Sequence, residues 1–104
     1  MDWYERLYSG KLADKKKDRI IQDINRGNYR GNTWLITLAA NPENQLEIFS
    51  VHQLRFSYIQ RNCPMILGIA SGYREALEVL EVIVKEVLEA TGDVKIREYF
   101  EQQD

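Results

Sequence analysis

Residues 65–90 read MILGIASGYREALEVLEVIVKEVLEA, an apolar strand pattern joined to a long amphipathic helix pattern. Met65–Ala70 is apolar almost throughout, which predicts a buried strand that leads directly into the helix. Across Gly72–Ala90 the apolar residues recur every three or four positions, and Gly92 provides a stop. The residues expected on the buried face are Tyr73, Ala76, Leu77, Leu80, Ile83, Val84, Val87 and Leu88. The charged residues of this helix, Glu75 among them, are expected to face solvent.

Two further strands are expected before this pair. Thr33–Ala40 has apolar residues on both faces, which is typical of a central strand. Leu46–Phe49 follows across the turn-rich link 41–44, which is short enough for an antiparallel hairpin, and Glu47 indicates an edge strand. With a right-handed crossover to the third strand, we expect a small mixed three-stranded sheet in the order 2-1-3.

Helices are expected in the remaining segments. They are predicted around residues 3–7, over 14–26 and over 93–101. The sequence Ser-Val-His-Gln at 50–53 has the form of a capping box, which predicts the start of another helix. The chain is therefore interpreted as a single α+β domain, 1–104, with the element order α-α-β-β-α-β-α-α.

Composition and charge bound the class of protein. A hydrophobic content of 44% places the chain among ordinary globular proteins rather than disordered ones. Residues 1–31 carry eight Lys and Arg against five Asp and Glu, whereas residues 72–104 carry four against nine, so the basic head and acidic tail could attract each other. Cys63 is the only cysteine, and no apolar run suits a signal peptide or a membrane span. We expect a cytoplasmic protein without a membrane partner.

The strand-to-helix turn is the first candidate ligand site. Free N–H groups at Gly68, Ser71 and Gly72 could hold a phosphate or carboxylate with help from the helix dipole, and Arg74 could add a cation. The turn lacks the spacing of a dinucleotide fingerprint and the Gly-Lys-Ser/Thr of a P-loop. An ordinary structural turn is therefore the alternative.

A basic cluster near the N-terminus is the second candidate. Its cations are Lys15, Lys16, Lys17, Arg19, Arg26 and Arg30. Phosphate contacts combined with stacking on Tyr29 would be the logic of nucleic-acid binding. Asp14, Asp18 and Asp23 interrupt the cluster, which favours a solvated helix face over nucleic acid.

Aromatic residues gather at both ends of the chain. They are Trp3, Tyr4, Tyr8, Tyr99 and Phe100. Large amphipathic rings are enriched in interface cores, and they also cap small domains. If the helices cover only one face of the sheet, these residues are the expected interface of a homodimer.

No catalytic residue, metal ligand or cofactor is predicted. His52 and Cys63 have no nearby acid and no recognised flanking motif that would make them a base and a nucleophile. Glu75 and Glu78 stand three apart on the long helix, but they alternate with cations as on a solvated face.

Five segments resemble a group of short bacterial proteins of unknown function. They are Asn28–Gly31, Trp34–Ala40, Gln45–Ile48, Ile66–Ala70 and Glu75–Leu77. The resemblance implies a bacterial cytoplasmic source and no activity. The leading hypothesis is a non-enzymatic interaction or regulatory module that self-associates. The alternatives are a small-ligand or enzymatic domain that uses the turn, and nucleic-acid binding through the basic cluster.

Overall fold

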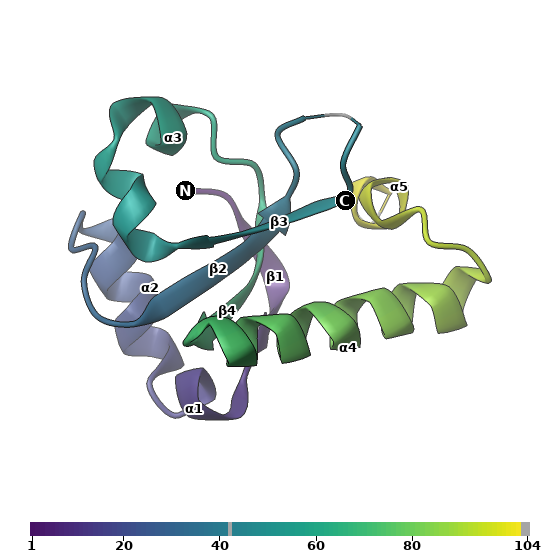
Figure 1. Cartoon of the computed structure of the whole chain (residues 1–104), viewed down its shortest axis with the longest axis horizontal. Helices are drawn as coiled ribbons and strands as arrows, with labels where there is room; N and C mark the ends of the chain where they lie inside the picture. The colour runs from purple at the N-terminus through teal and green to yellow at the C-terminus, as the bar shows by residue number, and fades with distance from the viewer. Residues whose placement is uncertain (42, 103–104) are drawn as a thin grey trace.

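The computed structural model describes residues 1–41 and 43–102, so Pro42, in the predicted link 41–44, lies outside the described residues (Figure 1). The described residues form four strands and six helical segments, one of them a 3-10 helix. They are β1 (Trp3–Ser9), α1 (Lys11–Asp14), α2 (Lys17–Asn25), β2 (Thr33–Leu38), β3 (Leu46–Ser50), the 3-10 helix η1 (Val51–Arg55), α3 (Ser57–Arg61), β4 (Ile66–Ser71), α4 (Tyr73–Thr91) and α5 (Ile96–Glu101). The fold is α+β, as predicted.

The sheet has four strands in the order β1-β4-β2-β3, so the prediction of three strands was wrong in its extent. Strand β2 is antiparallel to β3 and to β4, and β1 runs parallel to β4. The predicted three strands are neighbours, and β1 extends the sheet beyond β4 where a helix was expected.

Strand β1 has a physical reason for its helix-like pattern. Tyr4 and Leu7, three residues apart, are its buried residues, and they belong to opposite cores. The pairing with β4 shifts register between Trp3 and Tyr8. An irregular edge strand that contributes one residue to each core does not show the strict alternation by which a strand is predicted, so the helix expected around residues 3–7 is wrong.

Helices cover both faces of the sheet. One core lies between the sheet, α4 and α5, and it includes Ile36, Leu67, Ile83 and Phe100. The second core lies on the other face beneath α1, α2 and η1. Among the described residues, helices pack against each face of the sheet, which weakens the expectation of a homodimer formed through a half-covered sheet.

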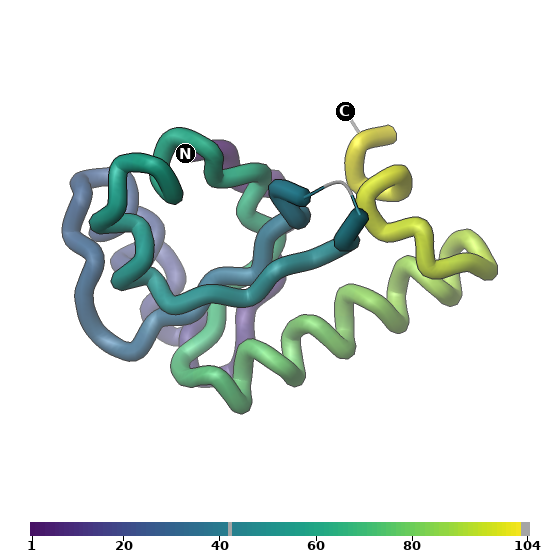
Figure 2. The backbone as a smooth tube through the Cα atoms, turned by 45° about the horizontal axis from the view of Figure 1, so that its top comes forward, coloured from purple at the N-terminus to yellow at the C-terminus, as the bar shows by residue number. Residues whose placement is uncertain are grey.

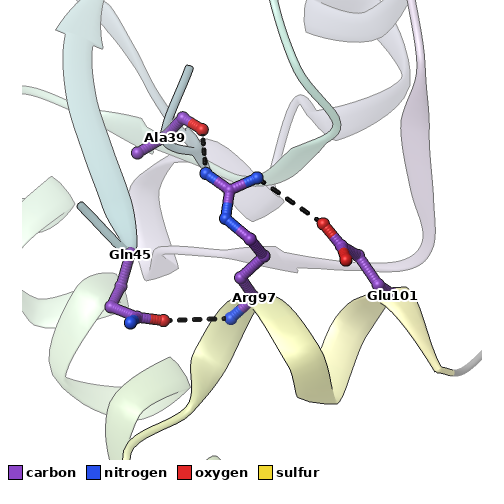
Figure 3. Close-up of polar contacts among 4 residues, drawn as sticks. All are labelled: Ala39, Gln45, Arg97 and Glu101. Carbon is purple, nitrogen blue, oxygen red and sulfur yellow. Dashed lines mark hydrogen bonds and ion pairs between the residues drawn. The ribbon is translucent and has the colours of Figure 1, made fainter. Parts of the chain in front are cut away.

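Helix α5 closes the end of the first core. Figure 2 shows the chain turning back after α4, so that α5 comes beside the β2–β3 hairpin. The Arg97 guanidinium donates to the carbonyl of Ala39, and the Arg97 backbone N–H donates to Gln45 Oε1 at 3.2 Å (Figure 3). Arg97 Nη1 also lies 3.5 Å from Glu101 Oε1. These contacts hold α5 to the hairpin.

Thr37 places a polar group inside the core. Its side chain is fully buried in β2, and its hydroxyl has no hydrogen-bond partner among the described residues. Thr37→Val removes a buried unsatisfied hydroxyl and keeps a β-branched shape, so we expect about 1 kcal/mol more stability and a Tm about 4–8 °C higher. Thermal unfolding followed by circular dichroism measures this.

The matched control is Thr91→Val. The Thr91 hydroxyl donates to the carbonyl of Val87 at 2.8 Å and accepts from the N–H of Asp93 at 3.2 Å. The same substitution there should lower the Tm, because it removes hydrogen bonds that are made. A lower Tm for Thr37→Val would mean that the Thr37 hydroxyl is satisfied, for instance by a buried water.

Candidate anion-binding site

The strand-to-helix turn already holds a carboxylate, that of Glu75. Ser71 N–H donates to Oε1 at 2.9 Å, Leu12 N–H to Oε2 at 3.0 Å and Ala13 N–H to Oε1 at 3.2 Å. Glu75 is only 8% exposed, so the expectation that it faces solvent was wrong. The turn has the donors of an anion site, and the chain's own side chain fills it.

Glu75 caps the start of α1 from a distant part of the chain. Gly10 precedes α1 and has no side chain to accept from the free N–H groups of the first turn. Glu75 accepts two of them and complements the helix dipole. An added Cβ at Gly10 would lie 2.1 Å from Glu75 Oε1. Gly10 is therefore needed for space.

The other predicted residues of the turn serve mainly the fold. Gly68 is buried, and an added Cβ there would meet α4. Gly72 has φ of 91°, and its N–H donates to the carbonyl of Asn32 at 2.8 Å. Arg74 is exposed on α4. Ser71 lines the cavity described next, and the other three residues do not.

A basic cavity of about 300 Å³ lies at one end of the sheet. Lys16 and Arg19 line it from the start of α2, Arg30 from the loop before β2, and Ser71 from the end of β4. The remaining lining residues are Ile20, Asp23, Gly31, Asn32 and Thr33. Three cations against one carboxylate give the lining a formal charge of +2. The cavity brings together residues of both predicted phosphate-binding candidates.

The position of the basic cavity follows from the sheet topology. Thr33 at the start of β2 pairs with Ser71 at the end of β4, because the two strands are antiparallel. Here the carboxyl end of β4 and the amino end of β2 contribute polar side chains at the same edge.

The loop that carries Arg30 is held in place by η1 and α3. Its hydrogen bonds are His52 Nε2 to the Gly31 carbonyl at 2.9 Å, Arg55 Nη2 to the Tyr29 carbonyl at 3.2 Å and Gln60 Nε2 to the Tyr29 hydroxyl at 2.7 Å. Gly31 has φ of 83°, which glycine adopts without strain. Because residues on both sides of Arg30 are fixed, the backbone that carries its exposed side chain is positioned at the cavity when the chain folds.

The other predicted cations lie outside the basic cavity. Lys15 and Lys17 line a neighbouring hollow, which shares Lys16 and Arg19 with the cavity and adds two aspartates. Arg26 ends α2 and lines neither. Half of the predicted basic cluster, Lys16, Arg19 and Arg30, therefore lines the basic cavity, and the other half does not.

Four of the predicted aromatic interface residues, Tyr4, Tyr8, Tyr99 and Phe100, pack together where β1 meets α5, whereas Trp3 packs against the second core. Tyr4 and Phe100 are buried in the first core, with ring centroids 5.0 Å apart and rings nearly perpendicular. Tyr99 is half-buried, and its ring centroid lies 5.0 Å from that of Phe100. Tyr4 and Phe100 thus contribute to the domain's own packing.

Tyr8 and Trp3 have polar partners within the chain. Burial, together with a hydrogen bond to Glu86, raises the pKa of Tyr8, so its hydroxyl stays protonated at neutral pH. Trp3 Nε1 donates to Asn25 Oδ1 at 3.0 Å. Both rings are half-buried.

The remaining chemistry-bearing groups have structural surroundings. Burial raises the pKa of the Cys63 thiol, which disfavours the nucleophilic thiolate. Across residues 1–41 and 43–102, no three His, Cys, Asp or Glu residues gather closely enough to hold a metal ion. Within the same residues, no helix combines the length and apolar content needed to cross a membrane.

The sequence did not predict that Asn32 and Thr33 belong to the site or that Glu75 caps α1. Asn32 and Thr33 reach the cavity only through the pairing of β2 with β4, which the sequence does not show. Glu75 did carry a signal, because it directly precedes Ala76 and lies four residues before Val79 on the helix. That spacing places it beside the buried face.

Comparison with known proteins returned no match, whether to a family model, a curated protein or a solved structure. The function is therefore inferred from the geometry of the described residues.

Proposed function

We propose that this protein binds a small phosphate-bearing ligand in the basic cavity. The observation that carries the proposal is the convergence of Lys16, Arg19 and Arg30 with Ser71 on one cavity of about 300 Å³. This volume is at the lower end of the range for small-molecule sites, which suits a compact anion. The formal charge of +2 on the lining favours a dianion.

The lining offers two kinds of group to a phosphate, cationic side chains and hydroxyl groups. Arg19 and Arg30 offer planar guanidinium groups that can make paired hydrogen bonds to phosphate oxygens, and Lys16 adds a point charge. The Ser71 and Thr33 hydroxyl groups can donate to further oxygens. The backbone N–H groups of Ser71 and Gly72 are already engaged within the protein, so side chains make the anion contacts.

Two observations favour ligand binding over self-association through the aromatic ends of the chain. Tyr4 and Phe100 are buried in the core of a single chain, and helices cover both faces of the sheet. The evidence for a dimer interface at these aromatic residues is therefore weaker than the sequence indicated. The basic cavity, in contrast, draws on cations that make no ion pair among the described residues.

Titration with inorganic pyrophosphate tests the proposal. At low ionic strength, isothermal titration calorimetry should detect binding to the unaltered protein. Arg19→Ala and Arg30→Ala should each weaken it about 10- to 100-fold, because each removes charge-assisted hydrogen bonds of about 1.5–3 kcal/mol. Arg26→Ala is the matched control, since Arg26 carries the same charge outside the cavity.

Two results would count against the proposal. One is the absence of pyrophosphate binding at millimolar concentration. The other is an equal loss of binding in Arg26→Ala, which would mean that the ligand responds to the overall charge of the segment rather than to the cavity.

Nucleic acid is the second candidate ligand. The hollow lined by Lys15 and Lys17 continues from the basic cavity through Lys16 and Arg19, which could extend phosphate contacts along a strand. In the same calorimetric series, an oligonucleotide that binds more tightly than pyrophosphate and is weakened by Lys15→Ala and Lys17→Ala would favour this candidate. Equal binding by those variants and the unaltered protein would favour the small ligand.

A further inference from the structure

The apolar residues of α4 lie on two faces, whereas the periodicity predicted a single apolar face. Ala76, Val79, Ile83 and Val87 are buried against the sheet. A second row, the flank stripe, runs along one side of the helix and consists of Tyr73, Leu77, Leu80, Val84 and Leu88. Three of its members are well exposed: Tyr73 at 51%, Leu77 at 40% and Leu88 at 46%. We propose that the flank stripe is the interface of a homodimer in which the α4 helices of the two copies pack antiparallel to each other.

The flank stripe has the spacing of a helix-packing seam. Steps of four, three, four and four residues place its members along one line, about 22 Å from end to end. A strip of this spacing and length is what a second helix contacts when two helices pack side by side. The far side of α4 shows no such row, since Val82, at 49% exposed, stands between charged residues.

Residues of the sheet extend the apolar surface beside the flank stripe. Trp34 on β2 packs against Tyr73 with ring centroids 5.1 Å apart. Leu46 and Ile48 on the edge strand β3 are only partly buried, although they contact the first core. The apolar surface therefore continues from Tyr73 onto Trp34 of the sheet and is larger than one helix row, and the partly buried residues of β3 belong to the same side of the sheet.

The charges beside the flank stripe identify a second copy as the occupant. An antiparallel pairing that sets Leu77 opposite Leu80 of the second copy also sets Tyr73 opposite its Val84. In this register, Arg74 comes beside Glu81 of the second copy, and two-fold symmetry repeats the pair. Arg74 and Glu81 are both exposed, and neither forms an ion pair within the described chain. The stripe is thus complementary to itself.

Sedimentation analysis across a concentration series tests the dimer. The weight-average mass of the unaltered protein should rise towards twice that of the monomer. Leu77→Glu should raise the dimer dissociation constant at least about 100-fold, because it buries a charge twice in the seam. Val82→Glu is the matched control and should leave the constant unchanged, since Val82, which is somewhat more exposed than Leu77, lies on the other side of α4.

Charge reversal tests the register. Arg74→Glu should weaken the dimer about tenfold, because it replaces two attractive pairs by two repulsive ones. Adding Glu81→Arg should restore most of the loss, while circular dichroism confirms that each variant is folded. A protein that stays monomeric at millimolar concentration overturns the proposal, as does a dimer that Leu77→Glu leaves intact. A double variant no tighter than Arg74→Glu overturns the register.

Discussion

Gly10→Ala is expected to lower the free energy of unfolding by about 2–4 kcal/mol, a large effect for the addition of one methyl group. The new Cβ would lie 2.1 Å from Glu75 Oε1 and 2.2 Å from Glu75 Cδ, distances that no real contact tolerates. The carboxylate would therefore have to leave the three N–H groups that it accepts from Ser71, Leu12 and Ala13. Those donors would lose a charged partner in a partly or fully buried site.

A double-mutant cycle separates the clash from other effects. Glu75→Ala alone should cost about 3–5 kcal/mol, because it leaves the same donors without their partner. In the Glu75→Ala background, Gly10→Ala should cost less than about 1 kcal/mol, since the space is then free. Urea unfolding measures all four proteins. Additive costs would contradict the role of Glu75 as the group that excludes a side chain from position 10.

Gly68→Ala is the second substitution with a large expected effect. Its Cβ would lie 2.9 Å from Val79 Cγ1 and 3.3 Å from the carbonyl oxygen of Tyr8. One neighbour belongs to α4 and the other to the backbone of β1, so relief requires the helix or the strand to move. We expect a loss of about 2–3 kcal/mol in urea unfolding.

Gly27→Ala is the control for Gly68→Ala. Gly27 has φ of 83°, and an added Cβ would meet nothing within 4 Å. Its cost should be limited to the strain of the left-handed conformation, about 1 kcal/mol. If Gly68→Ala costs no more than Gly27→Ala, then β4 and α4 are not packed as closely as described.

The parts of the fold that could be predicted from the sequence have strong local patterns. The strand at Ile66–Ser71 and the helix at Tyr73–Thr91 follow from an apolar run and from helical periodicity. Strand β1 could not be predicted in this way, because its pairing with β4 is irregular and its buried residues serve two cores. A partner strand some sixty residues away decides its structure, and the local sequence does not report that partner.

For the long helix, the sequence predicts an apolar face but not which of its residues are buried. Periodicity predicted one apolar face, and eight residues were assigned to it. Tyr73, Leu77 and Leu88 are exposed, whereas Val79 and Glu75 are buried. Periodicity gives the direction of an apolar face but not its width, and only the sheet determines which residues are covered.

The candidate site was predicted in parts that the sequence could not join. The cations Lys16, Arg19 and Arg30 and the turn residue Ser71 were assigned to two separate functions. The antiparallel pairing of β2 with β4 sets the start of β2 against Ser71, so that the preceding loop brings Arg30 to the same cavity, and α2 adds the other two cations. Both steps are tertiary, so the cavity emerges only from the assembled fold.

The most direct test of ligand binding in the basic cavity is a titration of isotope-labelled protein with inorganic pyrophosphate, followed by amide nuclear magnetic resonance. We expect the largest shifts on the amides of Lys16, Arg19, Arg30–Thr33 and Ser71, all with the same dissociation constant. Amides that shift elsewhere while these stay unchanged, or a spectrum that does not respond at millimolar pyrophosphate, would contradict ligand binding in this cavity.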